Sequence, residues 1–368
     1  MKNFLKCFVI ITLIVSILFT ATNSAHAINL KEAVLNSDSV AKAFAVVEKN
    51  SNRLIMAKEE NKKLPMASTT KIVTAIAVIE NNDLDKVITV PKAADGVEGS
   101  SMYLKEGDKY SIKDLLYGLM LRSGNDCAVA LAVGTSGSVE TFVTLMNTVA
   151  RKCGAANSHF TNPHGLDEDN HYTTAYDLAI ITAYALKNET FATIVKSKSY
   201  VLSNGETICN KNKLLSSYDG CDGVKTGYTS KAGRCLVASA TRQGITYICV
   251  VLCCGPMFEE CANKLEKAFD CLVMSDIICV NSPINKVKVV GGRRQYVSVG
   301  IASITHFPFT EEEIAGLSFG FELPDSISAP VEKGEKIGKI HIYERNRLLF
   351  SEDLFTMENV ELNYDYCN

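Results

Sequence analysis

A serine that precedes a lysine by three residues occurs twice in the chain, as Ser39 with Lys42 and as Ser68 with Lys71. Residues at this spacing share one face of a helix, with Cβ atoms roughly 5–6 Å apart, so the amine reaches the hydroxyl group. A neutral amine in that position is a base that can activate a serine nucleophile. Only Ser68 stands at the predicted start of a helix, where free N–H groups and the helix dipole stabilise an oxyanion. Taken alone, either pair is more often a helix cap beside a solvated lysine.

Two tripeptides, each present once, complete the pattern. Ser123-Gly124-Asn125 falls between two predicted helices, and Lys225-Thr226-Gly227 falls on a predicted strand. Lys71 is a base only when neutral, and at an ordinary pKa of about 10.4 this costs roughly 4.6 kcal/mol at pH 7. Burial and the nearby cation Lys225 both lower the pKa. We therefore expect a depressed pKa for Lys71.

Residues 28 to about 275 resemble the low-molecular-mass penicillin-binding proteins of the D-alanyl-D-alanine carboxypeptidase family. These enzymes are serine acyltransferases with the same three motifs in the same order. Further segments carry the resemblance, namely Asn162-Pro163-His164-Gly165-Leu166, Asp222-Gly223-Val224-Lys225-Thr226-Gly227, Ala232-Gly233 and Leu236-Val237-Ala238-Ser239-Ala240-Thr241. The tail after residue 280 is also similar to the second domain of this family.

The resemblance implies a role for each motif residue. Ser68 would be the nucleophile, Lys71 its base, and Ser123 a relay that passes the proton to the leaving amine. Asn125 would bind the backbone amide of the substrate. The carboxylate of a peptidoglycan stem peptide ending in D-Ala-D-Ala would be held by Lys225 and Thr226, with Gly227 leaving room for it. The N–H groups of Ser68 and Tyr228 would form the oxyanion hole. β-Lactam antibiotics would be covalent inhibitors.

Hydrophobic periodicity predicts the elements that position these groups. Strands are expected over 43–49, 53–57, 223–227, 235–241 and 246–254, and helices over 69–80, 111–121, from 126, from 174 and over 256–274. The first two strands form a hairpin, and the first and last could share one sheet. The helix that starts at Thr69 is apolar nearly all round, which predicts a central position. The fold class is α/β, an antiparallel sheet flanked by helices like those of penicillin-binding transpeptidases and β-lactamases.

The chain divides into three predicted parts. Residues 1–27 are typical of a secretory signal, with Lys2 and Lys6 before a short apolar run and a cleavage pattern near Ala27. We expect the exported chain to hold a serine D,D-peptidase domain over 28–280 and a small β-rich domain over 281–368. Acidic residues and no Lys or Arg follow Arg347, so we expect no C-terminal membrane anchor.

Composition excludes several other classes. A formal charge of −3 over 368 residues does not favour a nucleic-acid partner. The 13 cysteines show no zinc-binding spacing, so we expect no metal and no cofactor. Cys249, Cys253 and Cys254 are expected to be buried thiols in the last strand.

Several alternatives stay open. A β-lactamase would share the acylation chemistry, but class A β-lactamases usually carry Ser-Asp-Asn where this chain has Ser123-Gly124-Asn125. A non-catalytic envelope protein could keep the fold for binding. The Asn-Pro-His-Gly pattern is turn chemistry first, so we expect His164 to be structural rather than part of a Ser-His-Asp triad. Lys211 either adds positive potential near the carboxylate site or lies on a solvated face.

Overall fold

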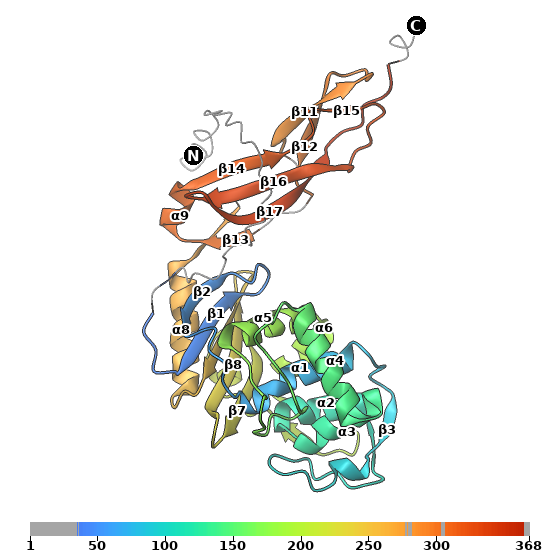
Figure 1. Cartoon of the computed structure of the whole chain (residues 1–368), viewed down its shortest axis with the longest axis vertical. Coiled ribbons are helices and arrows are strands. Elements are labelled where there is room, and N and C mark those ends of the chain that lie inside the picture. The colour runs from blue at the N-terminus through green and yellow to red at the C-terminus, as the bar shows by residue number, and fades with distance from the viewer. Residues whose placement is uncertain (1–34, 36, 277, 279–281, 303–305, 364–368) are drawn as a thin grey trace.

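The computed structural model describes residues 35, 37–276, 278, 282–302 and 306–363. The predicted secretory signal over 1–27 lies outside the described residues. Figure 1 shows an α/β domain that runs from β1 to α8, and a β-rich domain stacked on one end of it.

The α/β domain is built on an antiparallel sheet with the strand order β2-β1-β9-β8-β7. Val46 of β1 lies opposite Cys249 of β9, which confirms that the first and last strands share one sheet. The predicted hairpin near the N-terminus is also confirmed. The strands are β1 (Ala43–Glu48), β2 (Leu54–Lys58), β7 (Cys221–Thr229), β8 (Gly233–Arg242) and β9 (Ile245–Leu252).

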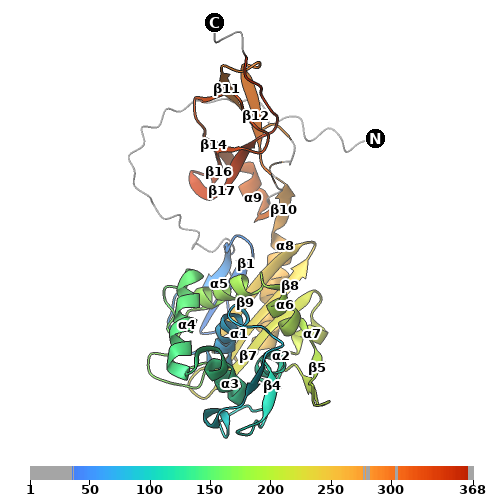
Figure 2. The ribbon, with the colours of Figure 1, turned by 90° about the vertical axis from the view of Figure 1, so that its right-hand side faces the viewer.

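Helices cover both faces of this sheet (Figure 2). Helix α8 packs on one face together with Leu214 of the short helix α7, and α1 to α6 form a larger layer on the opposite face. The helices are α1 (Lys71–Ile79), α2 (Ile112–Tyr117), α3 (Asn125–Ser136), α4 (Val139–Lys152), α5 (Ala175–Ala185), α6 (Glu189–Lys196), α7 (Leu214–Ser217) and α8 (Met257–Cys271). Two short hairpins, β3 (Val87–Thr89) with β4 (Lys109–Ser111) and β5 (Ser199–Val201) with β6 (Thr207–Cys209), lie outside the main sheet.

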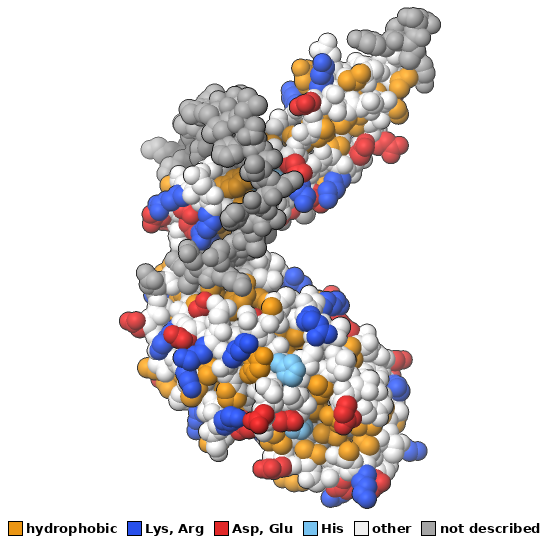
Figure 3. Space-filling model, in the orientation of Figure 1, with side chains coloured by type: hydrophobic (Ala, Val, Ile, Leu, Met, Phe, Trp, Pro, Cys, Tyr) orange, Lys and Arg blue, Asp and Glu red, His pale blue; other side chains and the backbone are white. Residues whose placement is uncertain are grey.

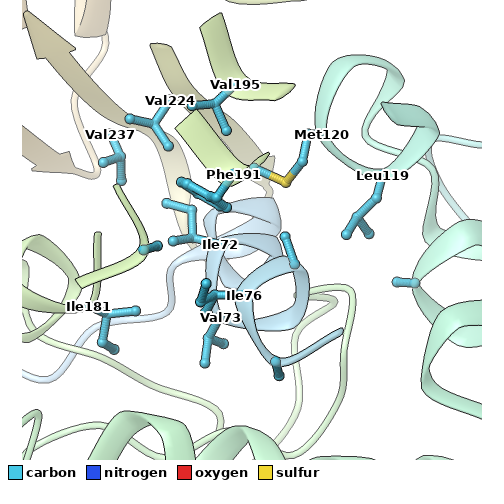
Figure 4. Close-up of a cluster of buried hydrophobic side chains, with 14 of the residues drawn as sticks. Ile72, Val73, Ile76, Leu119, Met120, Ile181, Phe191, Val195, Val224 and Val237 are labelled. Atoms are coloured by element: carbon cyan, nitrogen blue, oxygen red, sulfur yellow. The ribbon is translucent and has the colours of Figure 1, made fainter. Parts of the chain in front are cut away.

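Helix α1 runs through the middle of the larger layer, as its apolar sequence predicts. Ile72, Val73 and Ile76 point into the core cluster that Figure 4 shows, and Lys71 at the start of the helix is itself fully buried. An all-apolar helix has no face suited to water, so it is stable only when surrounded by other elements. The core therefore fixes the position of Lys71.

The segment that carries Ser123 is a break between two helices. The Ser111 side chain caps α2 by accepting a hydrogen bond from the Asp114 N–H at 3.0 Å, as expected from the sequence. After a π-helical turn, Gly118–Arg122, the chain leaves the helix at Ser123 with φ of +66°, and α3 begins at Asn125.

The β-rich domain contains a sheet with the strand order β14-β16-β17-β12-β11-β15. Its strands are β11 (Asn285–Val290), β12 (Tyr296–Gly300), β14 (Leu317–Glu322), β15 (Ser326–Ser328), β16 (Lys336–Glu344) and β17 (Arg347–Thr356). Beside it, β10 (Val273–Asp276) pairs with β13 (His306–Phe309), which leads into α9 (Glu311–Ala315). The helix expected to continue to residue 274 therefore ends at Cys271, because the chain is drawn into this strand pair.

One side chain from the α/β domain is buried against the β-rich domain. Arg53, between β1 and β2, is 2% exposed, donates to the Pro308 carbonyl and pairs with Glu313. Its guanidinium lies 4.8 Å from the Phe307 ring centre. Burial lowers the pKa of Arg53, and Glu313 partly opposes that effect. This contact joins the two domains near α9 and β13 (Figure 1).

The expectation of three buried thiols was right for two and wrong for the third. Cys249 and Cys254 are buried, whereas Cys253 is exposed. Strand β9 ends at Leu252, and Cys253 follows it with φ of +53°. The turn carries its side chain out of the apolar run.

Acidic and basic side chains are interspersed over the face of the α/β domain that Figure 3 shows. Within the described ranges, no single helix is long and apolar enough to cross a membrane. Helices α3 and α4 reach that length only together, and they meet at 89°.

Candidate active site

Ser68 lies in a tight turn at the entrance to the central helix. It belongs to the 3-10 turn Ala67–Thr70, which leads directly into α1. Ala67 has φ of +49°, a left-handed conformation that costs a non-glycine residue about 1–2 kcal/mol. Such local strain is typical of residues beside a functional group. Ser68 is half-buried, while the next three residues are buried.

The amine of Lys71 is surrounded by three oxygen atoms. Its Nζ lies 2.9 Å from Ser68 Oγ, 2.6 Å from Asn125 Oδ1 and 2.7 Å from the His164 carbonyl oxygen. A neutral amine has two N–H donors and one lone pair. The amide and carbonyl oxygens accept from the two donors, because neither oxygen can donate. The lone pair is then left for the Ser68 hydroxyl, the arrangement needed for proton transfer.

The environment of Lys71 favours this neutral form. Burial holds its pKa well below the ordinary value, and the charges of Lys225 and Lys211 lower it further. The expected depression is therefore confirmed, and so is the effect of Lys225. Burial also lowers the pKa of Lys225 to about 7, again with Lys211 contributing. The site thus concentrates lysine side chains with little compensating charge, which suits an anionic ligand.

Strand β7 brings the third motif against the Ser68 turn. Lys225 is 2% exposed, and its neighbour Gly227 lies against the backbone of the turn. A Cβ atom at Gly227 would be 3.0 Å from both the Met66 carbonyl oxygen and the Ser68 nitrogen. A side chain there would push the backbone of the turn back by a few tenths of an ångström, so glycine suits this approach. The next residue, Tyr228, has a side chain that is 67% exposed.

Of the second motif, the structure places Asn125 against the reactive amine, whereas Ser123 is buried without a hydrogen bond to it. Ser123 is 4% exposed and Asn125 is 3% exposed. Among the described residues, Lys71 is hydrogen-bonded to Asn125 and to no atom of Ser123. The sequence interpretation gave Asn125 only a substrate contact, so its bond to the amine is a new observation.

A turn over residues 162–166 supplies the contact that sequence reasoning missed. Asn162 Oδ1 accepts from the Gly165 N–H at 2.7 Å and so holds the turn closed. Gly165 has φ of +90°, and a Cβ atom there would lie 2.0 Å from the Ala67 carbonyl oxygen. This close approach puts the His164 carbonyl against Lys71 and the Pro163 carbonyl against Thr74 Oγ1, at 2.7 Å. The Asn-Pro-His-Gly motif was a signal for a turn but gave no indication of which carbonyl faces the amine.

Two histidines near this turn are held neutral. Burial lowers the pKa of His164 to about 3, and the Lys71 charge adds to the effect. Burial lowers the pKa of His171 to about 4. His171 Nδ1 accepts from the Thr161 N–H at 3.0 Å, so Nε2 carries the proton and donates to Thr70 Oγ1 at 2.9 Å. His171 therefore ties the turn to the helix start.

Lys211 lies beside the same site. Its amine donates to Ser100 Oγ at 3.0 Å, and its charge lowers the pKa of both Lys71 and Lys225. Of the two alternatives for Lys211, the structure favours positive potential near the buried lysines.

The fold and these contacts are those of the penicillin-binding class of serine peptidases, with a buried lysine beside a serine at the start of a helix. A family model for D-alanyl-D-alanine carboxypeptidase matches residues 30–254, and one for the C-terminal domain of penicillin-binding protein 5 matches residues 274–362. The chain belongs to the D-alanyl-D-alanine carboxypeptidase family and is a serine peptidase.

Individual relatives agree with this assignment. The chain is 32% identical over 335 residues to D-alanyl-D-alanine carboxypeptidase DacF of Bacillus subtilis, covering 87% of this chain and 86% of the relative. It is 43% identical over 221 residues to a Streptomyces K15 D-alanyl-D-alanine carboxypeptidase, covering 54% of this chain and 76% of the relative. The structure is similar to penicillin-binding protein 5 of Haemophilus influenzae, with TM-score 0.75, 29% identity and coverage of 89% and 100%.

Proposed function

We propose that Ser68 removes the terminal D-alanine from peptidoglycan stem peptides through an acyl-enzyme. The observation that carries the proposal is the fully buried Lys71 amine, 2.9 Å from Ser68 Oγ, with a pKa held well below its ordinary value. This geometry supplies the base that a serine nucleophile requires. The comparisons support the peptidase class, and the roles of the individual residues remain our proposal.

The substrate binds along β7 with its carboxylate toward the buried cations. Lys225 and Thr226 hold the terminal carboxylate, and Gly227 lets the peptide approach the Ser68 turn. Asn125 Nδ2 donates one hydrogen to Glu98 O at 2.6 Å and keeps a second for the substrate amide. A β-lactam carries a carboxylate that resembles the terminus of the peptide. It therefore makes the same contacts with Lys225 and Thr226.

The reaction proceeds in two steps. Lys71 takes the proton of Ser68 Oγ, which attacks the carbonyl carbon of the penultimate D-alanine. The N–H groups of Ser68 and Tyr228 stabilise the oxyanion. Ser123 passes the proton from Lys71 to the leaving amine, so the peptide bond breaks and free D-alanine departs. Water then hydrolyses the Ser68 ester and releases the shortened peptide.

The test is labelling with a fluorescent penicillin, followed by a D-alanine assay with a pentapeptide ending in D-Ala-D-Ala. We expect stoichiometric, slowly released label on the wild-type protein together with D-alanine release. Ser68→Ala abolishes both. Ser39→Ala is the matched control, because Ser39 has the same spacing to a lysine, and it retains both.

The alternatives give different results in the same experiment. Rapid turnover of penicillin without accumulated label would identify a β-lactamase. Absence of label on the folded wild-type protein would leave the non-catalytic binding role and refute our proposal.

We further propose that the protein acts outside the cytoplasmic membrane, where peptidoglycan lies. Export would follow cleavage near Ala27, leaving a peptidase domain over 28–280 and a β-rich domain over 281–368. Mass determination of the exported protein tests this directly, since a mature chain that begins at Ile28 is expected. Retention of residues 1–27 would refute the cleavage.

A further inference from the structure

The carboxylate of Asp126 lies just behind the site and binds residues 101–104, in addition to the N–H of its neighbour Cys127 at 2.9 Å. It accepts hydrogen bonds from Ser101 Oγ at 2.6 Å, from the Met102 N–H at 2.9 Å and from the Leu104 N–H at 3.1 Å. Asp126 is 1% exposed. Within the described part of the chain its hydrogen bonds come from backbone and hydroxyl donors, and no basic side chain pairs with it. A buried carboxylate satisfied in this way fixes the backbone that donates to it.

The segment 98–104 makes three hydrogen bonds with residues of the site. The Glu98 carbonyl accepts from Asn125 Nδ2 at 2.6 Å, and the Ser100 carbonyl accepts from the Asn125 N–H at 2.7 Å. Ser100 Oγ accepts from Lys211 Nζ at 3.0 Å. A Cβ atom at Gly99 would lie 2.7 Å from Asn125 Nδ2, so the segment 98–104 packs directly on this amide.

These contacts determine which end of the Asn125 amide faces the amine. Because Nδ2 donates to the Glu98 carbonyl, Oδ1 is directed at Lys71 Nζ, 2.6 Å away. A flipped amide would present a donor to the amine and would leave the Glu98 carbonyl opposite an acceptor. The orientation therefore depends on where the segment 98–104 lies.

We propose that Asp126 is a positioning residue, which anchors the segment 98–104 and thereby keeps the Asn125 oxygen directed at the reactive amine. The inference rests on the proposed function, since it gives Lys71 the part of the base. Asp126 touches neither the nucleophile nor the substrate carboxylate site in this scheme. It acts through the segment that it binds.

A pH profile separates positioning from a general loss of structure. The titratable groups that act on Lys71 are Lys225 from β7, Lys211, His164 from the turn 162–166, and Asp126 with Cys127 from α3. The Asp126 charge raises the pKa of Lys71. Asn125 Oδ1 also raises it, because this oxygen accepts a hydrogen bond from the ammonium form. Asp126→Asn weakens both effects, so the acid limb of the acylation rate moves to lower pH.

The experiment measures the second-order rate of penicillin acylation from pH 4 to 9. For Asp126→Asn we expect about a 10- to 100-fold loss at pH 7, together with the shift of the acid limb. Asp114→Asn is the matched control. Asp114 is 2% exposed and also accepts from a backbone N–H of another segment, that of Ser203 at 3.2 Å. We expect the control to keep the wild-type rate within about threefold and the wild-type pH limb.

A milder variant covers the case in which Asp126→Asn does not fold. Ser101→Ala removes one donor to the carboxylate and leaves the backbone donors in place, so an intermediate loss of rate is expected. If Asp126→Asn and Ser101→Ala both fold and keep the wild-type acylation rate and acid limb, the inference is overturned. Equal losses of acylation rate in Asp126→Asn and Asp114→Asn, without a shift of the acid limb, would also overturn it. If Asp126→Asn does not fold, a wild-type rate in Ser101→Ala alone overturns it. Failure of the wild-type protein to take label would instead refute the proposed function, and the inference with it.

Discussion

Replacement of Gly165 by alanine tests how closely the turn 162–166 must approach the nucleophile. An alanine Cβ would lie 2.0 Å from the Ala67 carbonyl oxygen, whereas ordinary contact begins at 3.4 Å. The turn must retreat by roughly 1 Å or more, and the 2.7 Å bond from Lys71 to the His164 carbonyl is then lost. Misplacement by about 1 Å near reacting atoms costs on the order of 100-fold in rate. We expect a loss of that size in penicillin acylation.

Stability provides the second readout and the control. Gly205 is the control, because it has a similar φ of +86° but no atom within 4 Å of an added Cβ. Gly165 has φ of +90°, and an added Cβ there would collide with the Ala67 carbonyl. Both alanine variants suffer about 1–2 kcal/mol from left-handed backbone, and Gly165→Ala adds about 1–3 kcal/mol from overpacking. Urea unfolding measures this difference. A folded Gly165→Ala protein that acylates within twofold of the wild type would refute the reasoning.

Three further predictions follow from the charges. The pKa of Lys225 is about 7, and in the proposed scheme its ammonium form binds the substrate carboxylate, so kcat/KM for the peptide should fall above pH 7. Because the Lys211 charge lowers this pKa, Lys211→Met should move the alkaline limb of the pH profile to higher pH. An alkaline limb that Lys211→Met leaves in place would contradict this prediction. The pKa of His171 is lowered from 6.5 to about 4, so its stabilising effect is complete above pH 6.5 and is lost as the pH falls toward 4. The difference in unfolding free energy between wild type and His171→Gln should shrink by about 3 kcal/mol over that range, and a constant difference would argue against it. Arg53→Met should cost about 3–5 kcal/mol, because among the described residues Glu313 then keeps a single cation, the more distant Arg347 at 3.4 Å. Limited proteolysis should then separate the domains while acylation is retained, and loss of acylation would show that the interdomain contact reaches the site.

Local patterns were sufficient to predict most of the scaffold. The spacing of Ser68 and Lys71 fixes their contact through helix geometry alone, and the apolar run from Ile72 predicts a central helix. That β1 and β9 share one sheet could be predicted from their continuous apolar runs, which are typical of interior strands. Each of these features depends on a few neighbouring residues, so it is visible in the sequence.

Backbone contacts across the fold could not be predicted in this way. The carbonyls of Glu98 and His164 orient Asn125 and Lys71, yet every residue has a carbonyl, and no side-chain type marks the one that will be used. The exposure of Cys253 was missed for a related reason, since the left-handed turn after Leu252 is not encoded by the apolar run that precedes it.

The strand order of the main sheet also governs when reactivity arises during folding. β1 and β9 must pair across about 200 intervening residues, and closing so long a loop costs roughly 5 kcal/mol of chain entropy. The turn Ala67–Thr70 and the start of α1 suffice to bring Ser68 and Lys71 together. The burial and the Lys225 charge that favour the neutral amine exist only once β7 has docked. In a partly folded chain we expect Lys71 to be protonated and Ser68 to be unreactive toward penicillin. The fraction of protein labelled by penicillin therefore reports the fraction of fully folded molecules.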